Sequence, residues 1–404
     1  MSIPAKYADI YLDHAAGTVV DPRVLTLMST YYGSEYRNPS SMHAGGRKAR
    51  QAIEEARENI AGAIHAESDE IIFTGSGTES DNLAITGAAR ARKAEGNHVI
   101  VSSVEHKAVL DAAKSLTKEG FEVSLLPVDH HGMVDPDTLA SHIRKETILV
   151  SVICANNELG TIAPIRELST KIAEVCANRS RPLFHTDACQ VLSYLDMDVK
   201  ALGVDLMTFN SAKLYGPTGI AALYKRRGVR LAPLMHGGEQ EQLLRPGTET
   251  LPLIKGFAYA ITLAGMLREE ERGRLEELRR YFIHGLKKRI PGFIVNGHPT
   301  EVLPNIVHTT VPGIEGEAML LMLDEHGIAV STGSACSAFD LRPSHVLSAI
   351  GQDSDLIHGS IRFSFGRDTT KEKLDYVLKV FPEIVSRLRS ISSVSTHAYE
   401  MQYR

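Results

Sequence analysis

Short apolar runs alternate with segments of helical spacing along the first half of the chain. Apolar and β-branched residues bounded by turn formers predict strands at 70–74, 98–102, 121–127, 147–153, 182–186 and 204–209. Apolar residues at helical spacing predict helices at 78–93, 105–118 and 165–177. This alternation predicts an α/β protein with a mostly parallel sheet that is covered by helices on both faces.

The pattern changes towards the C-terminus. A long charged stretch at 267–288 predicts a solvated helix that leads into a second region. From about residue 291 strand-like and helix-like segments alternate again on a smaller scale. We therefore expect a large domain followed by a smaller α/β domain.

Composition and charge exclude several classes of function. The chain has 404 residues, with 44 Lys and Arg against 49 Asp and Glu, which gives a net charge of −5. This balance argues against direct nucleic-acid binding or membrane-surface binding driven by net charge. No apolar run reaches transmembrane length and the N-terminus lacks a signal-peptide core, so we expect a cytoplasmic protein. The four cysteines form no CxxC pair, and no metal site is expected.

Two strand ends carry the strongest chemical signal. Lys213 follows the strand predicted at 204–209, and Asp187 ends the strand predicted at 182–186, with Gln190 one short turn beyond. A lysine at a strand end is usually a solvated loop residue. An acid and an amide at one strand end with a lysine at a nearby one are, however, typical of a pyridoxal phosphate site. There the lysine forms the Schiff base and the carboxylate keeps the pyridinium nitrogen protonated.

A glycine-rich turn at 74–80 follows a predicted strand and opens a predicted helix. Glycine lets the backbone approach a ligand closely, and the free N–H groups of a helix start favour a phosphate. Such turns are often purely structural, and this one is neither a Walker sequence nor GxGxxG. Its functional interpretation depends on the presence of Asp187 and Lys213 in the same chain.

Four further residues have a functional and a structural interpretation. His106 is either a helix cap or a ring that stacks on the cofactor and passes protons near neutral pH. Asn157 marks a turn or hydrogen-bonds a phenolate oxygen. Cys336, in a run of small polar residues, is an incidental loop cysteine or a reactive thiol. Arg362, in an alternating strand, pairs with a surface acid or clamps a substrate carboxylate.

Taken together, these motifs resemble the cysteine desulfurases of the NifS/IscS class, within the class-V aminotransferases and the fold-type I pyridoxal phosphate enzymes. The resemblance covers nearly the whole chain. It is carried by the runs at 11–16, 38–41, 77–82, 105–107, 156–158, 185–187, 245–249, 333–336 and 361–364. It implies a large cofactor-binding domain at 17–264, and a small domain formed by 1–16 and 265–404 that carries the loop of Cys336.

The resemblance also implies a role for each site residue. Lys213 would bind the cofactor covalently and move protons, Asp187 would pair with the ring nitrogen, and His106 would stack on the ring. Arg362 and Asn157 would hold the substrate carboxylate, and Cys336 would attack the substrate sulfur. The other cofactor contacts that it implies are Gly77, Thr78, Gln190 and, across a dimer interface, Thr248.

The chain departs from the family pattern in two places. The family often has Ser-Gly-His before the lysine, whereas this chain has Asn210, Ser211 and Ala212, so a phosphate-binding histidine is absent. We expect Asn210 or Ser211 to compensate. The ending after Ser390 also differs from the tail by which some family members dock an iron–sulfur scaffold protein.

The expected function is therefore that of a homodimeric cysteine desulfurase, which converts L-cysteine to L-alanine and leaves a persulfide on Cys336 for sulfur-acceptor proteins. Candidate acceptors belong to iron–sulfur cluster assembly, tRNA thiolation or DNA modification, and the sequence does not choose among them. The alternatives are a selenocysteine lyase or other β-eliminating enzyme on the same fold and, from another class, a non-catalytic sulfur-transfer scaffold.

Overall fold

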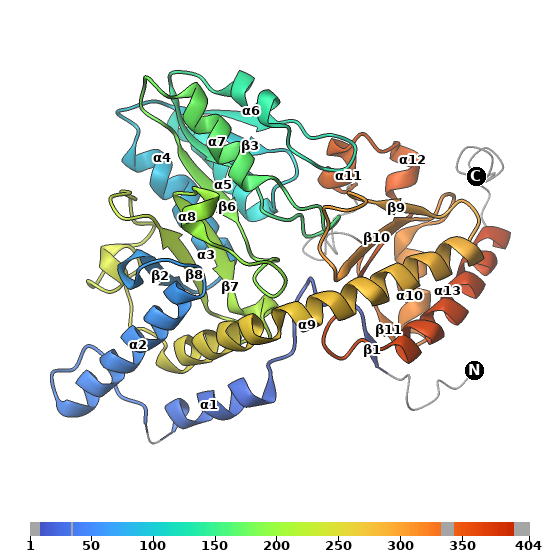
Figure 1. Cartoon of the computed structure of the whole chain (residues 1–404), viewed down its shortest axis with the longest axis horizontal. Coiled ribbons are helices and arrows are strands. Elements are labelled where there is room, and N and C mark those ends of the chain that lie inside the picture. The colour runs from blue at the N-terminus through green and yellow to red at the C-terminus, as the bar shows by residue number, and fades with distance from the viewer. Residues whose placement is uncertain (1–8, 34, 333–342, 392–404) are drawn as a thin grey trace.

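The computed structural model describes residues 9–33, 35–332 and 343–391 (Figure 1). Its largest element is a seven-stranded sheet with the strand order β2-β8-β7-β6-β5-β3-β4. The strands are β2 (Ile71–Thr74), β3 (His98–Ser102), β4 (Glu122–Leu126), β5 (Thr147–Ser151), β6 (Leu183–Asp187), β7 (Leu206–Asn210) and β8 (Ala221–Lys225). Neighbouring strands from β4 to β7 are parallel, and β8 is antiparallel to both β2 and β7. The predicted mostly parallel sheet is confirmed.

Successive side chains of the central strands pack in two different hydrophobic clusters, one on each face of the sheet. Met207 packs in one apolar cluster and Leu206 in another, and Val150 and Leu149 divide in the same way. Side chains of a strand point alternately to opposite faces, so both faces of the sheet are buried. The helices of this part are α3 (Gly77–Asn82), the π-helical η3 (Leu83–Gly87), α4 (Ala88–Ala91), α5 (Lys107–Leu116), α6 (Pro136–His142), α7 (Ile165–Val175) and α8 (Val199–Leu202). The 3-10 turns are η2 (Ser68–Glu70), η4 (Thr117–Glu119), η5 (Ser211–Lys213) and η6 (Glu241–Leu243).

One long helix, α9 (Leu251–Arg289), runs along the molecule from the large sheet to the C-terminal part (Figure 1). The sequence predicted only its second half. The first half is apolar and buried through residues such as Ile254, Phe257 and Ile261, where α1 (Pro22–Tyr32) and α2 (Ala44–Gly62) pack against it. The second half is not fully solvated either, since Leu275 and Phe282 are buried.

The C-terminal part holds a smaller antiparallel sheet with the order β12-β10-β9. Its strands are β9 (Ile294–Asn296), β10 (Ile306–Thr310) and β12 (Ser360–Ser364), and its helices are α10 (Gly316–Asp324), α11 (His345–Ala349), α12 (Ser354–Ile357) and α13 (Lys371–Ile391). The N-terminal β1 (Ile10–Tyr11) pairs in parallel with β11 (Ile328–Ala329), beside this sheet. Residues 10–11 are thus joined to the C-terminal part. Because α9 runs unbroken through residue 264, the domain boundaries stay a prediction.

No helix in the described part of the chain is long and apolar enough to cross a membrane.

Candidate active site

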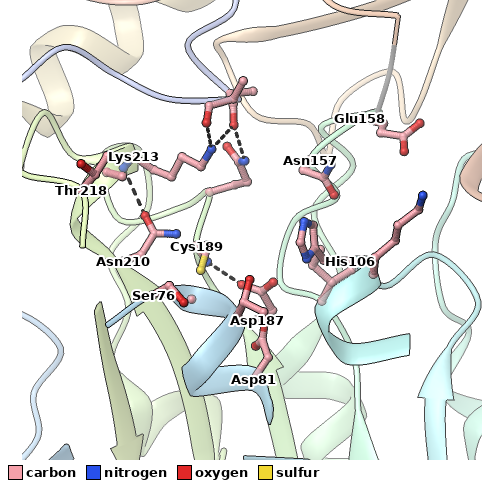
Figure 2. A pocket seen from close by; sticks show the side chains of 18 of the residues that line it. Ser76, Asp81, His106, Asn157, Glu158, Asp187, Cys189, Asn210, Lys213 and Thr218 are labelled. Atoms are coloured by element: carbon pink, nitrogen blue, oxygen red, sulfur yellow. Dashed lines mark hydrogen bonds between the residues drawn. The ribbon is translucent and has the colours of Figure 1, made fainter. Parts of the chain in front are cut away.

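A cavity of about 390 Å³ opens where the carboxyl ends of β6 and β7 meet the start of α3 (Figure 2). Ligands of parallel α/β sheets usually bind at this edge. Nine of the predicted site residues line it: Gly77, Thr78, His106, Asn157, Asp187, Gln190, Asn210, Lys213 and Arg362. They come from segments that are far apart in the sequence, so the fold brings together what the sequence only suggested. Cys336 lies outside the described residues.

Asp187 is the last residue of β6 and is 5% exposed. The backbone N–H of Cys189 donates a hydrogen bond of 2.9 Å to its Oδ1. A hydrogen bond from a backbone N–H favours the charged form of a carboxyl group. This hydrogen bond fixes the orientation of the Asp187 carboxylate at the floor of the cavity.

Lys213 ends the short turn η5, directly after β7. The side chain of Asn210 caps this turn, because its Oδ1 accepts a hydrogen bond of 3.2 Å from the backbone N–H of Lys213. The Lys213 Nζ donates to the backbone carbonyls of Ala15, at 2.6 Å, and Ala16. Gln190 Nε2 also donates to Ala15, at 3.0 Å (Figure 2). The N-terminal segment thus closes one side of the cavity.

The glycine-rich turn approaches the other side. A Cβ atom added to Gly77 would lie 3.0 Å from Cys189 Sγ and 3.3 Å from Asn210 Nδ2, so a side chain there would crowd the cavity wall. Ser76 caps α3, since its Oγ accepts a hydrogen bond of 3.1 Å from the Glu79 backbone N–H. The backbone of Gly77 and Thr78 is therefore open to a ligand at the start of this helical segment.

His106 is a helix cap and also lines the cavity, while its stacking on the cofactor and its proton transfer stay predictions. It is the N-cap of α5, because its Nδ1 accepts a hydrogen bond of 3.1 Å from the backbone N–H of Ala108. Its ring also lines the cavity (Figure 2). When the ring is neutral, this cap places the proton on Nε2, because Nδ1 acts as the acceptor.

Two more buried acids near Asp187 were not predicted. Asp81 lines the cavity floor, and its Oδ1 lies 3.7 Å from His185 Nε2. Burial and the charge of Asp187 raise the pKa of Asp81 well above its ordinary value. Burial, with the charge of Asp187, likewise raises the pKa of Glu105 to about 8, while burial lowers the pKa of His185 to about 3. The spacing of Asp81, three residues after Thr78 on one helix face, was the signal that could have found it.

Arg362 pairs with an acid and also lines the cavity, while its binding of a substrate carboxylate stays a prediction. It is 2% exposed, and its Nη2 donates a hydrogen bond of 2.7 Å to Asp13 Oδ1. Its Nη1 donates to the backbone carbonyl of Asn157, at 2.8 Å. The guanidinium lines the cavity at the same time. Arg362 thus has an acidic partner, which is largely buried rather than on the surface, and still faces the site.

Two predicted cofactor contacts do not line this cavity. Ser211 is 0% exposed, and a Cβ on Gly216 would come within 2.1 Å of its Oγ. Ser211 is buried and does not line the cavity, so its compensation for Ala212 stays a prediction that this structure does not support by contact. Thr248 is exposed on this chain, and its contact across a dimer interface stays a prediction.

The donor set of the cavity fits pyridoxal phosphate. Lys213 offers an amine, Asp187 a carboxylate beside it on the neighbouring strand, and His106 an aromatic face, while the turn at Gly77 leaves backbone N–H groups for a phosphate. The chemistry of a ring nitrogen, an aldehyde and a phosphate matches this arrangement.

Comparisons with known proteins agree with this site. Residues 10–377 match the family described as aminotransferase class-V. The cysteine desulfurase IscS of Dictyoglomus turgidum (strain DSM 6724 / Z-1310) is 50% identical over 384 residues, which cover 95% of this chain and 96% of that protein. A solved structure described as a NifS-like protein has a TM-score of 0.88 at 35% identity and covers 94% of this chain and 100% of its own. Another, described as SspA in complex with cysteine, has a TM-score of 0.77 at 34% identity and covers 88% of this chain and 98% of its own.

These matches define the class of protein as an α/β pyridoxal phosphate enzyme. The chain belongs to the class-V aminotransferase family and, within it, to the NifS/IscS group that the sequence resembled.

Proposed function

We propose that this protein is a pyridoxal phosphate-dependent cysteine desulfurase that converts L-cysteine to L-alanine and passes the sulfur to Cys336. The observation that carries the proposal is the convergence of Lys213, Asp187 and Arg362 on one cavity. The full-length relative named cysteine desulfurase and the neighbour described with bound cysteine support it.

Each residue of the cavity has a task in this reaction. When bound, pyridoxal phosphate supplies an electron sink for the negative charge that develops on the substrate α-carbon. Lys213 would hold the cofactor and then move a proton at its Nζ, and Asp187 would keep the ring nitrogen protonated. His106 would pack on the ring, while Gly77 and Thr78 would bind the phosphate.

The remaining groups act on the substrate. Arg362 and Asn157 would hold the carboxylate of L-cysteine. The thiolate of Cys336 would attack the substrate sulfur, so that an S–S bond forms while the substrate Cβ–S bond breaks. The carbon fragment would then leave as alanine after taking up protons, for which Lys213 and His106 are the nearest candidates.

Two rival functions are separated by simple assays. A selenocysteine lyase would turn over selenocysteine in preference to cysteine, and the presence of Cys336 favours the desulfurase. A non-catalytic scaffold would need neither Lys213 nor Asp187 in a shared cavity, and both line it.

The partners remain part of the proposal. We expect a homodimer in the cytoplasm that delivers sulfur to acceptor proteins and binds neither nucleic acid nor membrane directly. A search for proteins that take up labelled persulfide sulfur would identify the acceptor.

The decisive experiment compares the cofactor-loaded wild type with Lys213→Ala and Cys336→Ser. Wild type should release sulfide from L-cysteine in the presence of a reductant, and mass spectrometry should place the persulfide on Cys336. Lys213→Ala should have no activity, whereas Cys336→Ser should keep the cofactor absorbance and release no sulfide. Cys189→Ser is the matched control and should stay active. Sulfide release by Lys213→Ala, or a persulfide on Cys189, would contradict the proposal.

A further inference from the structure

The guanidinium of Arg362 is held from two sides. Asp13 accepts a hydrogen bond from Nη2 at 2.7 Å, and the carbonyl of Asn157 accepts one from Nη1 at 2.8 Å. The backbone of Arg362 is fixed as well, since it exchanges hydrogen bonds of 2.7 and 3.2 Å with Ser331. Both the position and the plane of this side chain are therefore defined by its neighbours.

Asp13 itself is fixed by the chain around it. The carbonyl of Leu12 accepts a hydrogen bond of 2.7 Å from the Ser364 backbone N–H, and the N–H of His14 donates to the Ser364 carbonyl at 3.3 Å. The Asp13 side chain is 17% exposed, and Asp13 is not one of the described residues that line the cavity. Its carboxylate thus approaches Arg362 from outside the cavity, on a segment that is anchored to β12.

Arg362 keeps donors for a ligand. A guanidinium has five N–H groups, and the two contacts above use one on each Nη. The Nε is buried, and within residues 9–33, 35–332 and 343–391 it has no hydrogen-bond partner. Because the same side chain lines the cavity, the second N–H group on each Nη is available for another carboxylate.

We propose that Asp13 is a positioning residue that holds Arg362 in the orientation that binds the substrate carboxylate. The inference rests on the proposed function, because it takes Arg362 as the carboxylate site. Asp13 also offsets the cost of burying the Arg362 charge, which would otherwise favour a guanidinium turned towards water. Loss of Asp13 should therefore weaken substrate binding and leave the chemical step largely unaffected.

The test measures binding and turnover separately on the cofactor-loaded enzyme. L-alanine, which has the carboxylate but no thiol, is titrated by calorimetry, and KM and kcat are measured with L-cysteine. Asp13→Ala should raise the L-alanine Kd and the L-cysteine KM roughly tenfold, with kcat nearly unchanged. Asp13→Asn keeps an oxygen acceptor for Nη2 and should restore most of the affinity. Asp9→Ala removes an exposed acid from the same segment and should behave as wild type.

Several results would overturn the proposal. Wild-type affinity in Asp13→Ala would show that Asp13 does not position Arg362, and tighter binding would show that it competes with the substrate. An Asn variant as weak as the Ala variant would rule out the hydrogen bond as the cause. If Asp13→Ala does not fold, Asp13→Leu replaces it, because leucine is similar in size and has no acceptor, and wild-type affinity in that variant would equally refute the idea. Failure of wild type to release sulfide would refute the proposed function instead, because the L-alanine comparison does not depend on sulfur chemistry.

Discussion

The carboxyl groups at the floor of the cavity and at its outer wall have different electrostatic surroundings. Asp81 and Asp187 line the floor and Glu105 is buried behind it, and the charge of Asp187 raises the pKa of both other acids. We call the pair of Arg362 and Asp13 the outer wall: Arg362 lines the cavity, and Asp13 pairs with its guanidinium from outside the cavity. Both regions are largely buried, and the Asp13 carboxylate has the Arg362 guanidinium at 2.7 Å.

The difference indicates that the floor and the outer wall have different roles in binding. Buried carboxyl groups that share a small space cannot all ionise, so the floor concentrates its negative charge on one member. Asp81 and Glu105 are the members whose pKa is raised, and the charge of Asp187 is one cause of both shifts. The wall instead keeps a fixed ion pair with N–H groups to spare, which suits recognition of a carboxylate.

The largest expected effect concerns the charge of Asp187 at the floor of the cavity. Asp187→Asn removes the one charge that the floor is built to hold, and the rate of sulfide release should fall roughly a hundredfold or more. Asp81→Asn replaces a carboxyl group that we expect to be protonated with a neutral group of the same size, and the rate should change little. The measurement is sulfide release together with the cofactor absorbance of both variants.

These two variants are each other's control, since both change a buried floor acid to its amide. Equal losses would mean that Asp81 is also ionised, and the assignment of the floor's single charge to Asp187 would be wrong. A large loss in Asp81→Asn alone would assign the functional charge to Asp81.

A smaller effect concerns the pH dependence of stability. The pKa of Glu105 is about 8 in the folded protein, against about 4.3 in an unfolded chain. Between these values the folded state binds more protons, so stability falls as pH rises from about 4 to about 8. Glu105→Gln mimics the protonated form, because its oxygen can still accept from Ser102 and Ile153. Its thermal midpoint should match wild type near about pH 4 and exceed it by roughly 5 °C near about pH 9.

The exposed Glu325→Gln serves as the control and should show no such difference at either pH. A Glu105→Gln protein that loses stability equally at both pH values would show that Glu105 is ionised throughout this range.

The sequence predicted the strands and helices of the molecule better than it predicted which polar groups are buried. Strands such as β3 and β6 were predicted because apolar runs between turn formers have few alternatives. The antiparallel β8 was not, since strand direction depends on pairing with β2 and β7 rather than on local pattern. The first half of α9 was missed because its apolar residues have no polar face to reveal the helical period.

The site shows the same limit. Lys213 and Asp187 were found because they follow clear strands, and nearly all the motif residues do line one cavity. Asp81 and Glu105 were given no role, because a polar residue at the start of a helix usually faces solvent. Ser211 was assigned to the site as compensation for the side chain absent at Ala212, but it is buried and does not line the cavity. Burial of individual polar groups is a property of the packed fold, not of the local sequence.

The smallest expected effect extends the comparison to the side of the cavity that a second chain would cover. Thr248 is exposed here, and we expect its hydroxyl to reach the cofactor phosphate of the partner. A hydrogen bond to a charged group is worth about 1.5–3 kcal/mol, so Thr248→Val should weaken cofactor retention roughly tenfold or more, while Thr248→Ser should retain it. The measurement is the cofactor dissociation constant from absorbance after dialysis.

Mixed dimers of Thr248→Val and Lys213→Ala chains decide whether this contact crosses the interface. Such a dimer has a single site with Lys213, and it lies in the chain that lacks the Thr248 hydroxyl. If Thr248 acts across the interface, the Lys213→Ala chain supplies the missing hydroxyl, and that site should retain its cofactor as wild type does. If it instead loses the cofactor like the Thr248→Val homodimer, the hydroxyl acts within its own chain. The exposed position of Thr248 would then have to change on assembly, because in the single chain it does not line the cavity.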